Sequence, residues 1–196
     1  MCNKVSWLGL LALALPMAAF ANSIDASNAG GVVSGNSGGL TLTGSILIKF
    51  GSTVGSNLGS VAFTTGAFTS GDEQKGGTLA AGGSFSITGN GSNGVPNGVI
   101  FSGTFSSAKW SLTTLNDGTH VYTLTGAMVA TNGAVGATAQ LTVNTGTSLF
   151  DGSAPLASGD TTLTLTVPEP GTLSLFGTGL IGLAGAIRRK RGLFNL

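Results

Sequence analysis

The chain of 196 residues is rich in glycine and poor in charge. Charged residues make up 8% of it, against about a quarter in an ordinary soluble domain, while the hydrophobic share of 41% is close to normal. A net charge of +1 provides no long-range field that would attract a polyanion. One Cys and one His exclude an intrachain disulfide and a multi-histidine metal cage, so we expect neither a metal ion nor a cofactor.

Residues 1–21 have the pattern of a secretory signal peptide. Lys4 precedes an apolar run over residues 7–15, and Ala19 and Ala21 frame a small-x-small cleavage site. The run is too short to span a bilayer, which argues against a permanent N-terminal anchor. We therefore predict a signal peptide helix, export by the Sec machinery and cleavage after Ala21.

The middle of the chain, residues 22–167, predicts β-structure. Residues 22–39 contain few apolar anchors and are expected to form a flexible leader. Beyond them, apolar and polar residues alternate, as in half-buried strands. Strands are predicted at 40–50, 60–69, 84–88, 98–105, 109–115, 120–129, 140–144 and 162–167. Asn-Gly and similar turn signals separate several of them, and residues 151–160 are expected to form a loop before the last strand.

About eight short strands with Gly-rich turns predict a single all-β domain over residues 40–167. We expect an antiparallel β-sandwich resembling a jelly roll. A β-solenoid is the alternative, but glycine recurs with no fixed period. The three lysines and six carboxylates of residues 22–167 give a net charge of −3, which excludes a nucleic-acid binder.

Residues 168–196 have the features of an export-linked membrane segment. An uncharged stretch over residues 173–187 would reach about 22 Å as a helix, short of a hydrocarbon core of about 30 Å, a deficit that snorkelling basic side chains can offset. The positive-inside rule keeps the basic end cytoplasmic. We predict a transmembrane helix that holds the exported chain transiently at the inner membrane. The flanking residues are Val167, Pro168, Glu169 and Pro170 before it, and the basic topology signal Arg188, Arg189, Lys190 and Arg191 after it.

The C-terminal segment resembles the PEP-CTERM sorting signal of Gram-negative bacteria. It has a Pro-Glu-Pro motif, a short apolar segment and an Arg-rich end, and the chain also has a predicted signal peptide. The same tail is also called the ice-binding protein C-terminal domain. The resemblance covers residues 168–196 and implies that an exosortase, a membrane-embedded thiol transpeptidase, cuts near Pro168, Glu169 and Pro170. It also implies delivery to the cell surface or to an exopolysaccharide matrix. A plain C-terminal anchor with a chance Pro-Glu-Pro is the alternative.

Trp110 and Tyr122 are the candidate ligand-binding residues. They lie on neighbouring predicted strands joined by a turn at residues 116–118, so a hairpin could bring them to one face. Exposed, they would form a platform for a sugar ring, as in a carbohydrate-binding module. Buried, they would belong to the core beside Phe101 and Phe105, which we favour because large aromatic residues are mostly buried.

The remaining candidates are better explained as ordinary surface residues. His120 and Asp117 could act as the pair of a hydrolase, but we expect an exposed strand residue after a hairpin turn. Asp72 and Glu73 could contribute to a calcium site, but no second acidic cluster accompanies them, and a solvated turn is expected.

Paired threonines raise the hypothesis of ice binding, which would need a flat array of threonine side chains. Without a repeat, nothing in the sequence aligns them, and we expect them to be strand formers on a solvated face. The pairs are Thr41 with Thr43, Thr123 with Thr125, and Thr162 with Thr164 and Thr166.

The sequence thus favours a non-enzymatic protein of the cell surface or extracellular matrix. We expect a structural or adhesive role in association with exopolysaccharide. A carbohydrate-binding module, a hydrolase and an ice-binding protein are the alternatives.

Overall fold

The computed structural model describes residues 22–131 and 135–165, which we call the body. The predicted signal peptide and the predicted transmembrane helix at 173–187 lie outside these residues. Within the body, regular structure consists of strands and one 3₁₀ turn. No helix in this part of the chain is long and apolar enough to cross a membrane.

The strands follow one another through short connections. In chain order the elements are β1 (Asn22–Ala29), β2 (Val32–Asn36), β3 (Gly39–Phe50), β4 (Thr53–Thr64), β5 (Phe68–Asp72), β6 (Gly76–Leu79), β7 (Gly82–Asn90), η1 (Ser92–Gly94), β8 (Asn97–Thr114), β9 (His120–Ala130), β10 (Val135–Gly146) and β11 (Ser153–Leu165).

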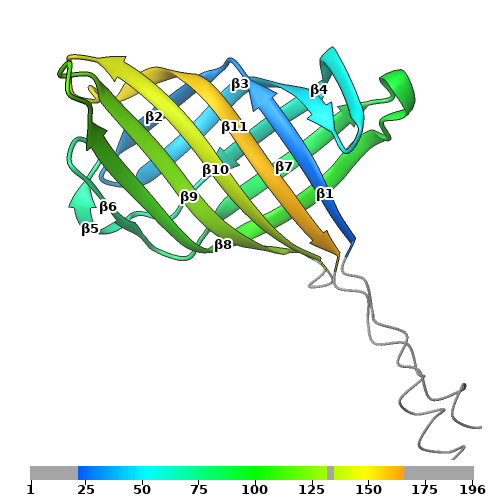
Figure 1. Cartoon of the computed structure of the whole chain (residues 1–196). Coiled ribbons are helices and arrows are strands. Elements are labelled where there is room, and N and C mark those ends of the chain that lie inside the picture. Colours follow the sequence, from blue (N-terminus) through cyan, green and yellow to red (C-terminus); the bar gives the residue numbers. More distant parts are fainter. Residues whose placement is uncertain (1–21, 132–134, 166–196) are drawn as a thin grey trace, which may run out of the picture. The chain divides into compact units, whose positions relative to one another are not determined.

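All strands belong to one antiparallel sheet that closes on itself (Figure 1). Its order runs β8-β7-β4-β3-β1-β11-β10-β9, and β9 pairs with β8 again. The prediction of an all-β antiparallel domain is confirmed, but the predicted sandwich of two packed sheets is wrong. Closure gives each of these strands a partner on both sides and leaves none of them as a sheet edge.

The predicted flexible leader at residues 22–39 is wrong, because it forms β1 and β2. The two strands lie end to end between β3 and β11 and pair with both. Gly30 and Gly31, with φ of +68° and +82°, join them, and a Cβ at Gly31 would clash with the backbone of Thr43.

Two segments that were expected to lie outside strands belong to strands in the structure. Residues 98–105 and 109–115 belong to one strand, β8, whose register shifts between Phe105 and Ser107. Ser106 and Ser107 both face solvent there, which breaks the alternation without ending the strand. Residues 151–160 are not a loop, since β11 begins at Ser153. The predicted strand at 60–69 is interrupted: β4 ends at Thr64, and β5 begins at Phe68. The rest of β5 and all of β6 were not predicted.

Aromatic side chains fill the inside of the closed sheet. Phe63, Phe85, Phe101 and Phe105 form one cluster, in which the ring centroids of contacting pairs lie 6.0–6.4 Å apart. A second cluster contains Trp110, Tyr122 and Phe150. Aliphatic side chains complete the core: Leu40, Leu42, Leu47, Leu58, Ile87, Leu124 and Leu141 are also fully buried.

Small residues make room for these rings. A Cβ at Gly126 of β9 would stand 2.6 Å from the ring of Phe105, so this position admits only glycine while the ring keeps its place. Ala108, Ala137 and Ala139 are buried nearby on β8 and β10. The glycine and alanine content of the chain therefore follows partly from the need to pack a few large rings at native density.

We predict that Phe85→Ala lowers the free energy of unfolding by about 3–5 kcal/mol, because it removes a ring that contacts three others in the core. Urea unfolding followed by circular dichroism measures this. Val99→Ala is the matched control, since Val99 is 68% exposed and its truncation should change stability little. Equal losses in both variants would contradict the assigned core.

Candidate functional site

Trp110 and Tyr122 come together, but inside the protein. Their rings stack with centroids 5.2 Å apart, and both side chains are buried. Trp110 Nε1 donates to the carbonyl of Glu73 (2.9 Å), and the Tyr122 hydroxyl donates to the carbonyl of Gln74 (2.7 Å). The same hydroxyl accepts from the backbone N–H of Phe150 (3.1 Å). The pair thus anchors the β5–β6 turn, and it offers no exposed ring face to a sugar.

His120 and Asp117 form separate local contacts at the β8–β9 turn. The Asp117 carboxylate accepts the backbone N–H of Thr119 (2.9 Å), which lowers the pKa of this carboxyl below its ordinary value. His120 Nδ1 lies 2.9 Å from the carbonyl of Gly118. Each group is engaged by the backbone of the turn, and the structure shows no hydrogen bond between the two among the described residues.

Asp72 closes the β5–β6 turn. Its carboxylate accepts the backbone N–H groups of Gln74 (2.9 Å) and Lys75 (2.7 Å). Glu73 contributes its carbonyl to Trp110. Over residues 22–131 and 135–165, no group of three or more His, Cys, Asp or Glu side chains could hold a metal ion.

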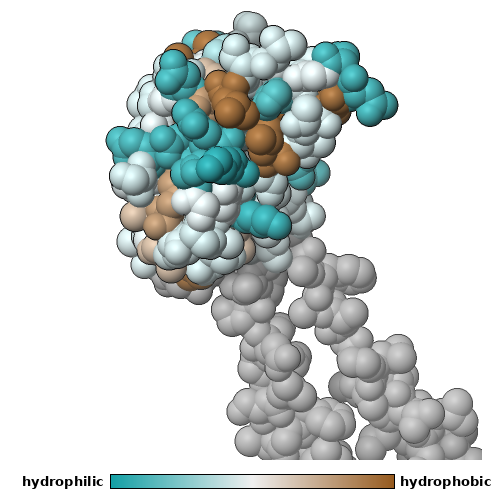
Figure 2. Space-filling model, turned by 90° about the vertical axis from the view of Figure 1, so that its left-hand side faces the viewer, coloured by the Kyte–Doolittle hydropathy of each residue, from teal (hydrophilic) through white to brown (hydrophobic). Residues whose placement is uncertain are grey.

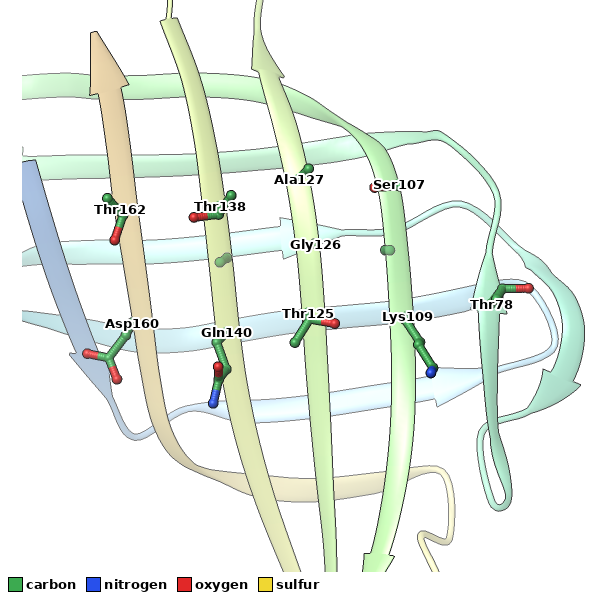
Figure 3. A pocket seen from close by; sticks show the side chains of 12 residues that line it. Thr78, Ser107, Lys109, Thr125, Gly126, Ala127, Thr138, Gln140, Asp160 and Thr162 are labelled. Atoms are coloured by element: carbon green, nitrogen blue, oxygen red, sulfur yellow. The ribbon is translucent and has the colours of Figure 1, made fainter. Parts of the chain in front are cut away.

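The outer face of β8, β9, β10 and β11 carries two parallel rows of mainly polar side chains (Figure 3). We call the first the Lys109 row; its members, each the register partner of the next, are Thr78, Lys109, Thr125, Gln140, Asp160, Ser27 and Lys49. The second, the Thr138 row, lies two positions further along the strands and consists of Ser107, Ala127, Thr138, Thr162 and Asp25.

The parts of the two rows that lie on β6 and β8–β11 line a shallow hollow of about 620 Å³. Six of its twelve lining residues carry a hydroxyl or amide group, Lys109 on β8 and Asp160 on β11 are its charged members, and alanine and glycine make up the rest. Gly126 and Ala127 contribute almost no side-chain volume in the middle, on β9. The Asp160 carboxylate also accepts a hydrogen bond from the Ser27 hydroxyl (2.7 Å).

The sequence does not indicate this hollow. Alternation identifies Thr125 and Gln140 as outward-facing strand residues, but only the register places them side by side. The signal that could have pointed to it is the polar half of the alternation in four consecutive strands, in which large apolar residues are rare.

The threonines do not form an array of their own. In the Lys109 row, Thr125 lies between Lys109 and Gln140, and in the Thr138 row, Thr162 lies between Thr138 and Asp25. The Lys109 row therefore mixes charged, amide and hydroxyl groups, and the Thr138 row mixes hydroxyl groups with an alanine and a carboxylate, on a closed sheet. This arrangement differs from the flat threonine array that the ice-binding hypothesis needs.

Large hydrophobic residues are scattered over the surface. Figure 2 shows one face of the body, on which they form small patches between hydrophilic residues. The exposed ones among the described residues come from separate strands and loops: Val32, Ile46, Val54, Val99, Leu115, Val129 and Leu149. Single exposed hydrophobic residues of this kind are ordinary and define no docking site.

Comparison with known families identifies the C-terminal segment. Residues 166–190 match the PEP-CTERM protein-sorting motif. The chain therefore carries a PEP-CTERM sorting motif, and this motif implies an exported protein that is sorted transiently at the membrane and processed by an exosortase. The match includes Val167, Pro168, Glu169, Pro170, Arg188, Arg189 and Lys190. No curated protein and no solved structure matches the chain.

The other predicted site residues of the two chain ends lie outside the described residues. They are Ala19 and Ala21 of the predicted cleavage site and Arg191 of the basic end.

We predict that Tyr122→Phe lowers the free energy of unfolding by about 1–3 kcal/mol. The change keeps the ring stack but leaves the backbone N–H of Phe150 and the carbonyl of Gln74 without their hydroxyl partner. Denaturant unfolding measures the loss. Retention on polysaccharide should stay unchanged, because the ring is buried. Unchanged stability with lost retention would contradict the core role.

We further predict that Asp117 makes the β8–β9 turn sensitive to acid. A carboxyl whose pKa is lowered on folding stabilises the folded state above its unfolded pKa, and this contribution disappears as the pH falls through the lowered pKa. Asp117→Asn keeps an acceptor oxygen for Thr119 but does not titrate. The variant should therefore lack this part of the loss of folding stability at low pH. Denaturant unfolding midpoints across the acid pH range measure the difference. Identical pH profiles would rule out the effect.

Proposed function

We propose that this is a non-enzymatic protein of the cell surface or extracellular matrix, with a structural or adhesive role in association with exopolysaccharide. The observation that carries the proposal is the sorting motif at residues 166–190, which begins directly after β11 ends at Leu165. Export by the Sec machinery supplies the substrate, and an exosortase releases the body from its membrane-bound intermediate.

The chemistry of the body supports a role without catalysis. Its single histidine contacts the backbone of its own turn, and its aromatic pair is used in the core. What faces solvent on β8–β11 is a set of hydroxyl, amide and isolated charged groups. Such a surface suits a neutral, hydrated matrix of polysaccharide.

The fold supports processing at both ends of the body. Asn22 and Leu165 are register partners, so the chain enters and leaves the closed sheet at the same place. Cleavage after Ala21 and near Pro168 would fall outside both strands. The pairing of β1 with β11 would therefore survive both cuts, and the released protein would keep its core.

We predict that replacing Pro168, Glu169 and Pro170 together by alanine blocks release. The variant should accumulate in the membrane fraction with an intact C-terminal segment, whereas the unaltered protein should be released with a smaller mass. Intact-mass measurement of both fractions, in cells with and without an exosortase, tests this.

Val99→Thr is the control, because it changes an exposed position of the body and leaves the motif intact. It should be processed like the unaltered protein. The same mass with and without an exosortase would overturn the sorting step. Hydrolytic activity of the released protein that is lost on substitution of His120 would overturn the non-enzymatic role.

Glycan binding through Trp110 and Tyr122 is not supported, because both rings are buried. A carbohydrate-binding role would depend on the outer face of β8–β11 instead.

A further inference from the structure

The hollow on the outer face of β8–β11 has the chemistry of a surface for polyhydroxylated ligands. Its lining includes the hydroxyls of Thr125, Thr138 and Thr162 and the amide of Gln140. A free hydroxyl can donate one hydrogen bond and accept two, and an amide can do both. The Thr162 hydroxyl already donates to the Asp25 carboxylate (3.0 Å) and offers a ligand its acceptor capacity. Thr125 and Thr138 are exposed, and no hydrogen bond within the described protein engages either side chain.

The charges of the hollow exclude a polyanion as its preferred ligand. Lys109 and Asp160 carry opposite charges and cancel. They stand in the same row, separated by Thr125 and Gln140. The Asp160 carboxylate also accepts the hydrogen bond of the Ser27 hydroxyl. A ligand without net charge satisfies this surface better than a polyanion does.

The length of the row favours a chain over a single sugar. Adjacent strands lie about 4.8 Å apart, so the three strand spacings from Lys109 to Asp160 cover about 14 Å. The row continues to Thr78 on one side and to Ser27 and Lys49 on the other. Evenly spaced polar groups over this distance can hydrogen bond successive units of an extended polymer. A free monosaccharide would contact only a fraction of them.

The hollow contains no aromatic and no large apolar side chain among its lining residues. Protein-binding hot spots depend on such side chains, and so does sugar stacking. The ligand must therefore be held by many weak hydrogen bonds along its length. Binding of this kind strengthens when many copies of a repeating unit are offered on one polymer.

From these four properties we propose that the hollow binds an extended, uncharged polysaccharide that runs across β8, β9, β10 and β11 along the Lys109 row. The inference rests on the proposed function, since it names the surface through which the exported protein meets its matrix. It adds a ligand class and a site that the sorting motif does not specify.

The test uses the processed protein as it is released from cells, in affinity electrophoresis through gels that contain dextran, galactomannan, hydroxyethyl cellulose or the anionic polymer alginate. We expect at least one of the three uncharged polymers to retard the protein equally at low and high salt. The double variant Thr125→Val and Thr138→Val should weaken this binding about tenfold, because valine keeps the shape of threonine but loses its hydrogen bonds.

The matched control is the double variant Thr43→Val and Thr88→Val. Thr43 on β3 and Thr88 on β7 also face outward, and no hydrogen bond within the described protein engages either side chain. The control should bind as the unaltered protein does, and circular dichroism should show both variants folded.

Three results would overturn the proposal: no retardation by any uncharged polymer, retardation by alginate alone, or equal weakening in the two double variants. Thermal hysteresis that is lost only in the Thr125 and Thr138 double variant would also overturn the proposal. It would show that this face of the sheet binds ice. None of these outcomes bears on exosortase-dependent release, which is measured separately by intact mass.

Discussion

The pairing of β1 with β11 is the interaction on which the rest of the structure depends. It joins the first strand of the body to the last, from Asn22 with Leu165 to Asn28 with Gly159, and so turns a row of hairpins into a closed sheet. Without it, β1 and the part of β11 beyond its short pairing with β2 would become free edges with unpaired backbone groups. It is also a contact between residues far apart in the sequence, which forms only after the entropy of closing the whole chain has been lost.

Closure determines what each face of the sheet must be. The inside is enclosed and must be filled, and two aromatic clusters fill it with help from glycine and alanine at positions such as Gly126. The side chains of Trp110 and Tyr122 are therefore buried in the core and present no surface to a ligand. Any ligand chemistry of β8–β11 is left to the outer face, where most side chains that line the hollow are polar.

The low content of charged residues fits this difference between a packed inner face and a polar outer face. The described lysines, Lys49, Lys75 and Lys109, are spread over separate elements, and Lys109 shares its row with Asp160. A surface of hydroxyls and amides stays hydrated without attracting polyanions. This property suits a protein that the PEP-CTERM motif marks for export and that we propose to reside in polysaccharide.

Strands whose inward-facing residues are large and apolar were predicted from the alternation of apolar and polar residues. Strands whose inward-facing residues are small or polar show weak alternation and were missed. The segment that became β9 was predicted because Tyr122, Leu124 and Met128 recur on one face. The segment that became β1 was missed because its inward residues are small or polar, with Ala26 and Asn28 buried. Asn28 is satisfied there by a hydrogen bond from its amide to the Ser45 hydroxyl, a contact between strands that local sequence cannot specify.

The closure of the sheet and the hollow on its outer face could not be predicted from the sequence, because both depend on contacts between strands that are distant in the chain. Strand number and turn chemistry are the same for a sandwich and for a closed sheet, and only long-range pairings separate them: β1 and β2 with β11 close the sheet. The outer rows depend on register across five strands, from Lys109 to Ser27, and a shift of one residue in any of them would turn its row members inward. The C-terminal motif, in contrast, is readable because its recognition depends on local order along the chain.

Native-state hydrogen exchange of the released protein tests the closed sheet most directly. The paired amides of β1 and β11 should exchange as slowly as those of β9 and β10, because all four strands then open only with the whole sheet. Exchange of the β1 and β11 amides at the rate of exposed loops, with β9 and β10 still protected, would show an open sheet and contradict the account.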